Sequence, residues 1–328
     1  MEHDLIVSSS PHIRGDNSTR GIMFDVLIPL IFPLGLATFL FGPRVLILTA
    51  LSVISCVVFE YLYRKLLKKS NTIGDMSAVV TGMLLVFTLP ASVPYWIPVV
   101  GAFFAIVLVK QLFGGLGQNF MNPALAARAF LFSWPAIMTT WPEHGAAVAL
   151  LGGADAVSVA TPLKQLKNGD VTGLSLPDLF IGQTAGSIGE ISVVLLLLGG
   201  LYLWVRGVIT PRIPVAFIGT VAVLTYIFAP DRATAVTFML SHVLSGGLVL
   251  GAIFMATDYA TSPVTKYGQI LFGAGCGALT VFIRFFGSLP EGVCYAILIM
   301  NTLTWLLDKA GKPKTFGTKK PKGGGGNG

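Results

Sequence analysis

The chain has 328 residues, of which 54% are hydrophobic and only 11% are charged. An average soluble domain has roughly 25% charged residues, and one soluble core of this size could not bury so much apolar surface. This composition excludes an ordinary soluble enzyme and predicts an all-α polytopic membrane protein. The net charge of +7 does not indicate nucleic acid, because the basic residues lie in short breaks between apolar runs and in the tail.

Apolar segments follow one another along the whole chain. A bilayer core of about 30 Å requires roughly 20 apolar residues per helix. Eight segments come close to that length, and they are 22–42, 44–63, 95–113, 190–206, 213–230, 236–256, 267–286 and 291–307. Two more, 76–90 and 123–134, are shorter and are bounded by Pro or Gly, which predicts helices that break within the membrane. We therefore expect about ten transmembrane segments.

Matching motifs in the two halves of the chain predict an internal repeat. Phe113-Gly114 precedes the segment at 123–134, and Phe286-Gly287 precedes the segment at 291–307. Two halves with five segments each must face opposite ways in the membrane, because five is an odd number. An inverted repeat of this kind places a site near the bilayer midplane, between broken helices.

The distribution of Lys and Arg predicts the orientation. If both termini are cytoplasmic and all segments cross, sixteen of the 22 basic residues lie inside, as the positive-inside rule favours. The chain then divides into a cytoplasmic segment 1–21, a membrane repeat 22–134, an extracytoplasmic loop 135–187, a second repeat 188–308 and a disordered basic tail 309–328. A connection as long as 135–187 is more often functional than idle.

The loop contains the sequence Ser158-Val159-Ala160-Thr161-Pro162. Proline biases the residue before it toward an extended conformation, which would present the hydroxyl of Thr161 on an exposed turn. By itself this pattern is more typical of a plain surface turn.

Longer motifs resemble a known family. The chain is similar to the D subunit of the Rnf-type ion-translocating ferredoxin:NAD oxidoreductase complex, and to its relative, the B subunit of the sodium-translocating NADH:quinone reductase. The motifs that carry the resemblance, in order, are Ser9-Ser10-Pro11-His12, the run from Gly114 to Phe130, Phe254-Met255-Ala256-Thr257-Asp258, Pro290-Glu291-Gly292-Val293 and the run from Ala296 to Asn301.

The resemblance implies a covalent flavin. In this family FMN is joined through its phosphate to a threonine in an S-x-A-T motif, and Ser158, Ala160 and Thr161 match that motif, with Val159 at a position that is often Gly. Thr161 is thus the expected attachment site. The resemblance also implies a second flavin held without a covalent link, such as riboflavin, and a bacterial or archaeal cytoplasmic membrane as the location. The expected partners are the other members of the Rnf-type complex, a flavin-attaching transferase and membrane lipid.

Ionisable residues within apolar segments usually face a cavity or a partner. Arg128 follows Asn122-Pro123, and we expect Asn122 and Arg128 to contribute to flavin binding, with pairing to an acid as the alternative for Arg128. Asp258 and Glu291 are candidates for an ion path, although Asp258 also suits a plain interfacial connection.

Two other acids have simpler interpretations. Glu60 has Arg64 four residues on, which predicts an interfacial ion pair. Glu190 lies near the start of a segment, where a carboxylate suits the helix dipole.

Cysteine and nucleotide motifs narrow the choice of function. Cys56, Cys276 and Cys294 lie far apart and match no metal-ligand spacing, so no metal site is expected, and no phosphate loop occurs. The sequence contains no recognisable catalytic residue or module for ferredoxin or NAD, which predicts one component of a larger enzyme instead of a complete one. The alternatives are a small-solute channel or transporter with an inverted repeat, and an inert assembly scaffold.

Overall fold

The computed structural model describes residues 18–142, 148, 161–167, 174–182, 184–287 and 291–311. It is 70% helical, and the residues that it describes form no strand. Within these residues, four helices are long and apolar enough to cross a membrane alone, and a bent pair, Ala235–Leu244 with Leu248–Met255, makes up to five. These findings confirm an all-α membrane protein. Each predicted segment contains a helix, but ten crossings and the inverted repeat stay predictions.

The first half of the chain combines long helices with short ones. Its elements are α1 (Thr19–Phe41), α2 (Arg44–Leu66), the short 3-10 helix η1 (Ile73–Asp75), α3 (Ser77–Phe87), α4 (Trp96–Phe103), which continues as the π-helix η2 (Phe104–Gln111), α5 (Pro123–Leu131) and α6 (Pro135–Met138). The short helix α3 ends before Pro90, and its free carbonyl groups are bonded from elsewhere in the chain. The amides of Ile188 and Gly189 donate to the carbonyls of Leu89 and Phe87 at 3.0 and 2.9 Å. Such partners are needed because water is absent from a bilayer core.

The second half contains a sharply bent element. Its elements are α7 (Pro162–Lys167), α8 (Leu176–Ile181), α9 (Val193–Val205), α10 (Arg212–Ile227), α11 (Ala235–Leu244), α12 (Leu248–Leu250), which continues as the π-helix η3 (Gly251–Met255), α13 (Lys266–Phe286) and α14 (Val293–Gly311). The segment 236–256, predicted as one span, is instead broken with a bend of 58°. Gly246 and Gly247 lie at the break with φ of +70° and +63°, which only glycine adopts without strain.

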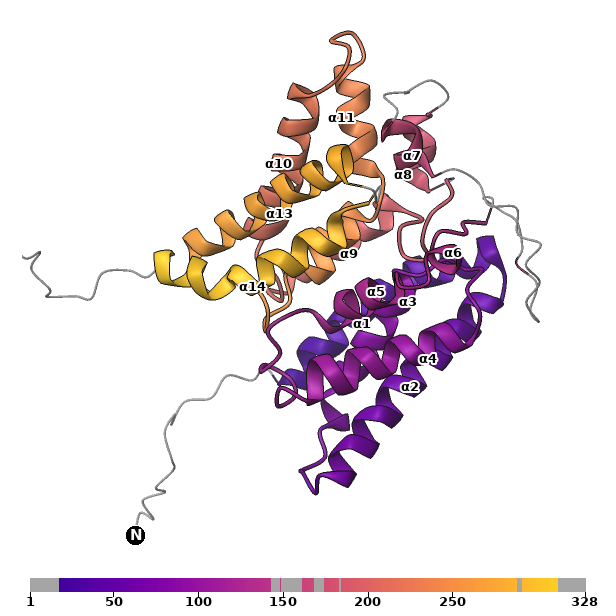
Figure 1. Ribbon diagram of the computed structural model, residues 1–328, viewed down its shortest axis with the longest axis vertical. Coiled ribbons are helices and arrows are strands. Elements are labelled where there is room, and N and C mark those ends of the chain that lie inside the picture. Colours follow the sequence, from indigo (N-terminus) through magenta and orange to yellow (C-terminus); the bar gives the residue numbers. More distant parts are fainter. Residues whose placement is uncertain are drawn as a thin grey trace, which may run out of the picture.

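The two halves form adjoining groups of helices. In Figure 1, α1 to α5 lie together in indigo and magenta, and α10 to α14 lie together in orange and yellow, with α9 between them. Helix α1 packs against α9 and α5 packs against α14, so both contacts join the halves. Within the first half, a Cβ added to Gly82 of α3 would lie 2.8 Å from the Cα of Val53 in α2. Glycine therefore sets the spacing of these two helices.

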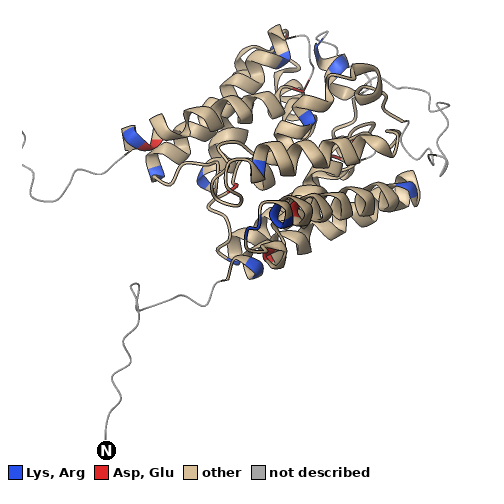
Figure 2. Ribbon diagram, turned by 60° about the horizontal axis from the view of Figure 1, so that its bottom comes forward, with Lys and Arg blue, Asp and Glu red and all other residues tan. Residues whose placement is uncertain are grey.

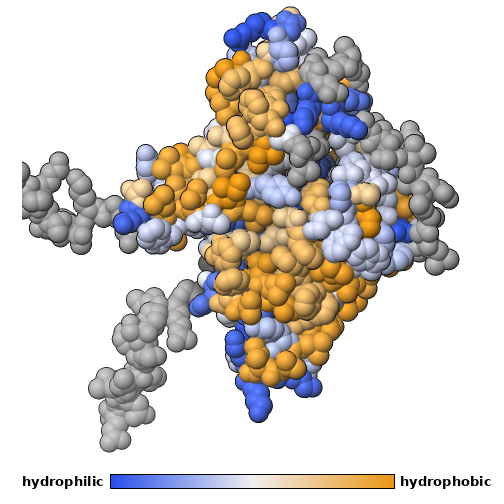
Figure 3. Space-filling view, in the orientation of Figure 1, coloured by the Kyte–Doolittle hydropathy of each residue, from blue (hydrophilic) through white to orange (hydrophobic). Residues whose placement is uncertain are grey.

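The surface is largely apolar, as expected for contact with lipid. Phe39, Val215, Phe286 and Trp305 are 84%, 67%, 77% and 72% exposed. Long stretches of helix carry no charged residue in Figure 2. Hydrophilic residues gather at the tip between α10 and α11 and at the foot of α2, with a broad apolar surface between them (Figure 3). A monomeric soluble protein rarely exposes so large an apolar surface.

Candidate functional site

The residues singled out in the sequence fall at two places in the fold. Asn122 and Asp258 line a cavity between the two halves, which we call the central cavity. Thr161 and Glu291 line smaller cavities beside the α11–α12 break. We call Thr161, Arg128, Glu190, Arg284 and Glu291 the Thr161 cluster. The two candidate ion-path residues, Asp258 and Glu291, thus belong to different sites.

The central cavity has a volume of about 80 Å³. Its walls come from α1, α3, η2, α5, α9 and η3, so both halves of the chain contribute. Both π-helices reach it, through Lys110 of η2 and Ile253 of η3. A π-helical turn contains one more residue than an α-helical turn, and such turns are frequent at functional sites. The polar side chains that line it include Ser77, Thr81, Lys110, Asn119, Asn122 and Asp258.

Asn122 joins the halves at this cavity. Its side-chain oxygen accepts from the amides of Ala124 and Leu125 at 3.0 and 3.2 Å and so caps α5. Its side-chain nitrogen donates to the carbonyl of Met255, at the end of η3, at 3.2 Å. These bonds give Asn122 a structural role beside its place in the cavity wall.

Asp258 lies in the turn after η3. Its side chain accepts a hydrogen bond from the hydroxyl of Thr261 at 3.2 Å, and its carbonyl accepts one from the amide of Ser262 at 3.0 Å. Burial raises the pKa of Asp258, because removal from water disfavours the charged carboxylate. Asp258 therefore belongs to the turn that follows η3, and it also lines the central cavity.

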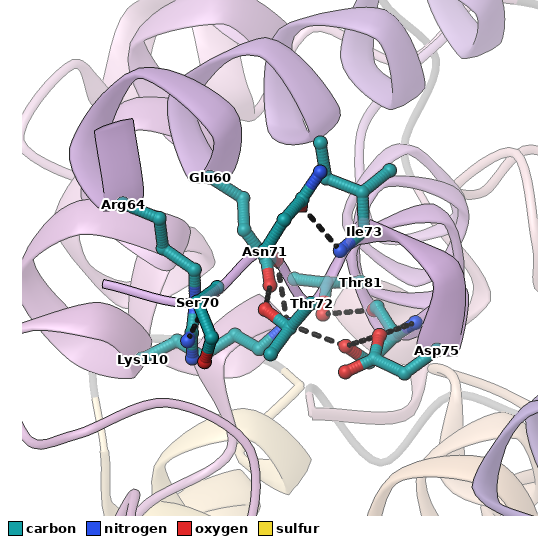
Figure 4. A network of polar contacts seen from close by, with 10 residues as sticks. Glu60, Arg64, Ser70, Asn71, Thr72, Ile73, Asp75, Thr81 and Lys110 are labelled. Carbon is teal, nitrogen blue, oxygen red and sulfur yellow. Dashed lines mark hydrogen bonds and ion pairs between the residues drawn. The ribbon is translucent and has the colours of Figure 1, made fainter. Parts of the chain in front are cut away.

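The structure contains a buried ion pair beside the central cavity that the sequence does not predict. Glu60 does not pair with Arg64 as expected; it accepts from Lys110 at 2.8 Å, and the two side chains are 0% and 2% exposed. Lys110 also donates to the hydroxyl of Ser77 at 2.6 Å, and Thr72 donates to Glu60 at 2.7 Å (Figure 4). Residues 50 positions apart on different helices form this pair, so no local spacing in the sequence indicates it.

Thr161 precedes helix α7 and is half-buried. It lines two cavities, of about 30 Å³ with Tyr295 and of about 20 Å³ with Glu190, and Glu291 lies on both. Its carbonyl accepts from the amide of Lys164 at 2.9 Å, in the first turn of α7. Ser158 and Ala160, the other two residues of the motif, lie outside the described residues.

Charged side chains surround these cavities. Arg128 of α5 forms an ion pair with Glu291, so the structure supports the acid-pairing alternative for Arg128. Glu190, three residues before α9, lies on the same cavity as Thr161, and its Oε1 atom makes no hydrogen bond with the residues that the structure describes. Burial, together with the nearby charge of Glu291, raises the pKa of Glu190 to about 7. The sequence interpretation, in which the Glu190 carboxylate suits the helix dipole, does not predict these charged neighbours.

Arg284 holds the α11–α12 break in place. Its guanidinium donates to the carbonyls of His242 at 2.6 Å, Ser245 at 3.0 Å and Glu291 at 3.1 Å. The first two carbonyls lie at the end of α11, where the break leaves carbonyl groups without partners in the helix. One side chain of α13 thus fixes the broken element and the start of α14 relative to each other.

The two cavities at Thr161 are lined by the carboxyls of Glu190 and Glu291 and, among the described residues, by no Lys or Arg side chain, so their lining alone does not fit an anionic phosphate. Thr161 is half-buried and directly precedes the short helix α7. Lys164, one turn along α7, is exposed nearby, and Arg128 and Arg284 lie in the same cluster as the two acids. Neither cavity, at about 30 and 20 Å³, has room for a flavin ring, so the attached group would extend out of them.

Comparison with known proteins decides the family. A family model described as "NQR2, RnfD, RnfE family" matches residues 6–317. The chain belongs to this family.

Relatives match over nearly their full length. The chain is 49% identical over 324 residues to the D subunit of the "Na(+)-translocating ferredoxin:NAD(+) oxidoreductase complex" of Acetobacterium woodii, covering 98% of each chain. It is 44% identical to the D subunit of the "Proton-translocating ferredoxin:NAD(+) oxidoreductase complex" of Clostridium ljungdahlii, covering 96% of each. It is 37% identical to the D subunit of the "Ion-translocating oxidoreductase complex" of Stutzerimonas stutzeri, covering 92% of this chain and 93% of the relative.

Proposed function

We propose that this chain is the D subunit of an ion-translocating ferredoxin:NAD oxidoreductase complex, and that it carries FMN joined through its phosphate to Thr161. The 49% identity to a relative with this complex name, over 98% of both chains, supports the first part. The half-buried Thr161 beside the cavities of its cluster supports the second. Such a protein works together with the other subunits of the complex and a flavin-attaching transferase.

Bound FMN would accept and donate electrons, and the protein would position it and shape its electrostatic surroundings. The hydroxyl of Thr161 would hold the phosphate. Arg284 would keep the cluster in shape through its bonds to three carbonyls. Arg128 would balance the charge of Glu291 beside the attachment point. With the termini in the cytoplasm, this flavin would lie on the extracytoplasmic side.

Mass spectrometry of the peptide that contains Thr161 tests this proposal. The complex is expressed with its transferase and run on a denaturing gel, where we expect fluorescence from the band of this chain and the added mass of one FMN on Thr161. The variant Thr161→Ala should lose both, whereas Thr184→Ala, on the same cavity wall, should keep both. An unmodified Thr161 with an active transferase would reject the covalent flavin and favour the channel or transporter alternative.

We propose that the second flavin, held without a covalent bond, such as riboflavin, binds at the central cavity, which at about 80 Å³ would have to widen to admit the ring. The amide, hydroxyl and ammonium groups of the cavity can bond the polar edge of a flavin, and Leu116 and Ile253 among its walls are apolar. Denaturation should then release one flavin from Thr161→Ala. Retention of full flavin release in a variant that fills the cavity, such as Ala124→Trp, would contradict this placement.

Asp258 and Glu291 remain our candidates for an ion path, one in each site. If the path runs through this chain, Asp258→Asn should slow ion transport by the assembled complex in vesicles while flavin content stays unchanged. Equal transport in the variant and the wild type would exclude Asp258 from the path.

A further inference from the structure

The smaller cavity at the α11–α12 break has a volume of about 20 Å³, which is enough for one water molecule or one small ion. Its polar side chains are two carboxyls, of Glu190 and Glu291, and three hydroxyls, of Thr161, Thr184 and Ser245. Among the described residues, no Lys, Arg or His side chain lines it. Oxygen is therefore the polar atom of every polar side chain on this wall, and oxygen is the ligand that hard cations prefer.

Two oxygen atoms on this wall lack a hydrogen-bond partner within the part of the chain that the structure describes. One is the hydroxyl of Ser245, a residue that is 6% exposed, and the other is the buried Oε1 atom of Glu190. A Cβ added to Gly247 would lie 2.6 Å from Oε1, and one added to Gly186 would lie 3.4 Å from Oε2, so the carboxyl lies between the break and the segment before α9. Buried polar atoms without a protein partner are rare, and they mark places where water or an ion binds.

The charges around the cavity point to a monovalent cation. Arg128 forms an ion pair with Glu291, and Arg284 donates its hydrogen bonds to three backbone carbonyls. The ion pairs among the described residues do not include Glu190. One carboxylate without a paired cation matches an ion of charge +1, whereas Ca²⁺ takes about 6 to 8 oxygen ligands and several carboxylates. Glu190 is half-buried, so an ion can reach its carboxyl from water.

The broken helix contributes to the same site. Helix α11 ends at Leu244, which lines the cavity, and Ser245 follows in an extended conformation. The carbonyl of Leu244 is not among those that Arg284 bonds, and the C-terminal end of a helix carries a partial negative charge. Discontinuous membrane helices bind monovalent cations with such ends and with the unwound backbone beside them. Helix α7, which lies beside α11 in Figure 1, covers the cavity with Pro162 and Leu163.

We propose that this cavity binds one small monovalent cation, for which Na⁺ is the probe, with the carboxylate of Glu190 and the hydroxyl of Ser245 as side-chain ligands. The carboxylate supplies the charge, the hydroxyl supplies a neutral oxygen, and water completes the coordination. Glu291, held by Arg128, forms another part of the wall. Binding here requires neither a flavin on Thr161 nor movement of the ion across the membrane, so it goes beyond the proposed function.

Thermal unfolding of the assembled complex at pH 8, in NaCl or in choline chloride at equal ionic strength, tests this site. Choline is too large for a cavity of about 20 Å³ and so controls for general effects of salt. A ligand that binds only the folded state raises the thermal midpoint as its concentration rises. We expect Na⁺ to raise the midpoint of the wild type. Glu190→Gln should require about tenfold more Na⁺ or lose the response, because cation affinity falls with the charge of the ligands.

Two further variants separate the roles of charge and ligand. Asp178→Asn removes a carboxyl from α8, in the same connection but outside the cavity wall, and should respond to Na⁺ like the wild type. Ser245→Ala removes the neutral ligand and keeps the charge, so it should weaken the response less than Glu190→Gln does.

Infrared difference spectra give a second measurement, at the ligand itself. Exchange of choline for Na⁺ over the immobilised complex should shift the carboxylate stretching bands of the wild type. These bands should be absent from the difference spectrum of Glu190→Gln and should appear at other frequencies in Glu190→Asp.

Each outcome decides a different point. Equal Na⁺ responses in the wild type and Glu190→Gln, or a wild-type midpoint that is the same in both salts, would overturn the proposal. If Glu190→Gln fails to assemble, identical carboxylate bands in the wild type and Glu190→Asp would overturn it as well. Absence of FMN from the Thr161 peptide, seen separately by mass spectrometry, would reject the proposed function and leave the cation site standing.

Discussion

Buried charges are the residues with the largest energetic consequences in this chain. Lys110 and Glu60 are 2% and 0% exposed and are 2.8 Å apart. Removing one partner of such a pair leaves an uncompensated buried charge and costs about 3 to 5 kcal/mol, whereas replacing both with neutral groups is often tolerated. We expect Lys110→Met to lower the thermal midpoint in detergent strongly, and the double variant Lys110→Met with Glu60→Gln to recover most of it. A double variant no better than the single one would show that the pair is not energetically coupled.

Glu190 should make stability depend on pH. Its pKa is raised from 4.5 to about 7 in the folded chain, so the folded state holds a proton that the unfolded chain releases between these values. The stabilisation that this proton provides is present at acidic pH and is lost as pH rises through about 7. Glu190→Gln should therefore raise the thermal midpoint more at pH 8 than at pH 5. Thermal scans of both proteins at the two pH values test this, and an equal shift at both would contradict it.

At the scale of elements, the short and broken helices depend on close backbone contacts. A Cβ on Gly82 of α3 would meet the backbone of Val53 at 2.8 Å, whereas a Cβ on Gly35 of α1 would have no atom within 4 Å. Alanine is the better helix former by about 1 kcal/mol. Gly82→Ala should therefore destabilise the chain because α2 and α3 must move apart, and Gly35→Ala should leave its thermal midpoint unchanged or slightly higher. Equal midpoints for the two variants would show that α2 and α3 are not tightly packed.

The whole molecule should cross the membrane with the Thr161 cluster outside and the foot of α2 inside. Gln165 in α7 and Lys69 after α2 are both exposed, and the native cysteines Cys56, Cys276 and Cys294 are buried. In intact cells, a membrane-impermeant thiol reagent should label Gln165→Cys and not Lys69→Cys, and permeabilised cells should show both. Labelling of Lys69→Cys alone in intact cells would reverse the orientation.

Local patterns in the sequence predict the elements well and their breaks less well. Apolar length and Pro or Gly at the boundaries predict α3 and α5 as short helices, as the structure shows. The same patterns do not indicate the bend in 236–256. Glycine pairs in apolar runs are equally typical of helix packing, and the positive φ angles of Gly246 and Gly247 appear only in the fold.

In the candidate sites, too, the sequence predicts residues but not the contacts that they make. Motif alone predicts Asn122 and Arg128 as flavin contacts. In the structure Asn122 caps α5 and bonds to Met255, and Arg128 pairs with Glu291. Whether either also touches a flavin stays a prediction. No local pattern singles out Glu190, because the residues around its carboxyl, Arg128 and Glu291 among them, are distant in the chain.

Composition and the length of the apolar segments are enough to predict the class of protein, because a bilayer accepts each segment according to its own length and hydrophobicity. The sequence also carried the family, through motifs spread from one end of the chain to the other. Which charged side chains form ion pairs depends on the fold. Glu60 pairs with Lys110 and Glu291 with Arg128 across 50 and 163 positions, because buried charges select partners by position in space, and that position is set by how the helices pack.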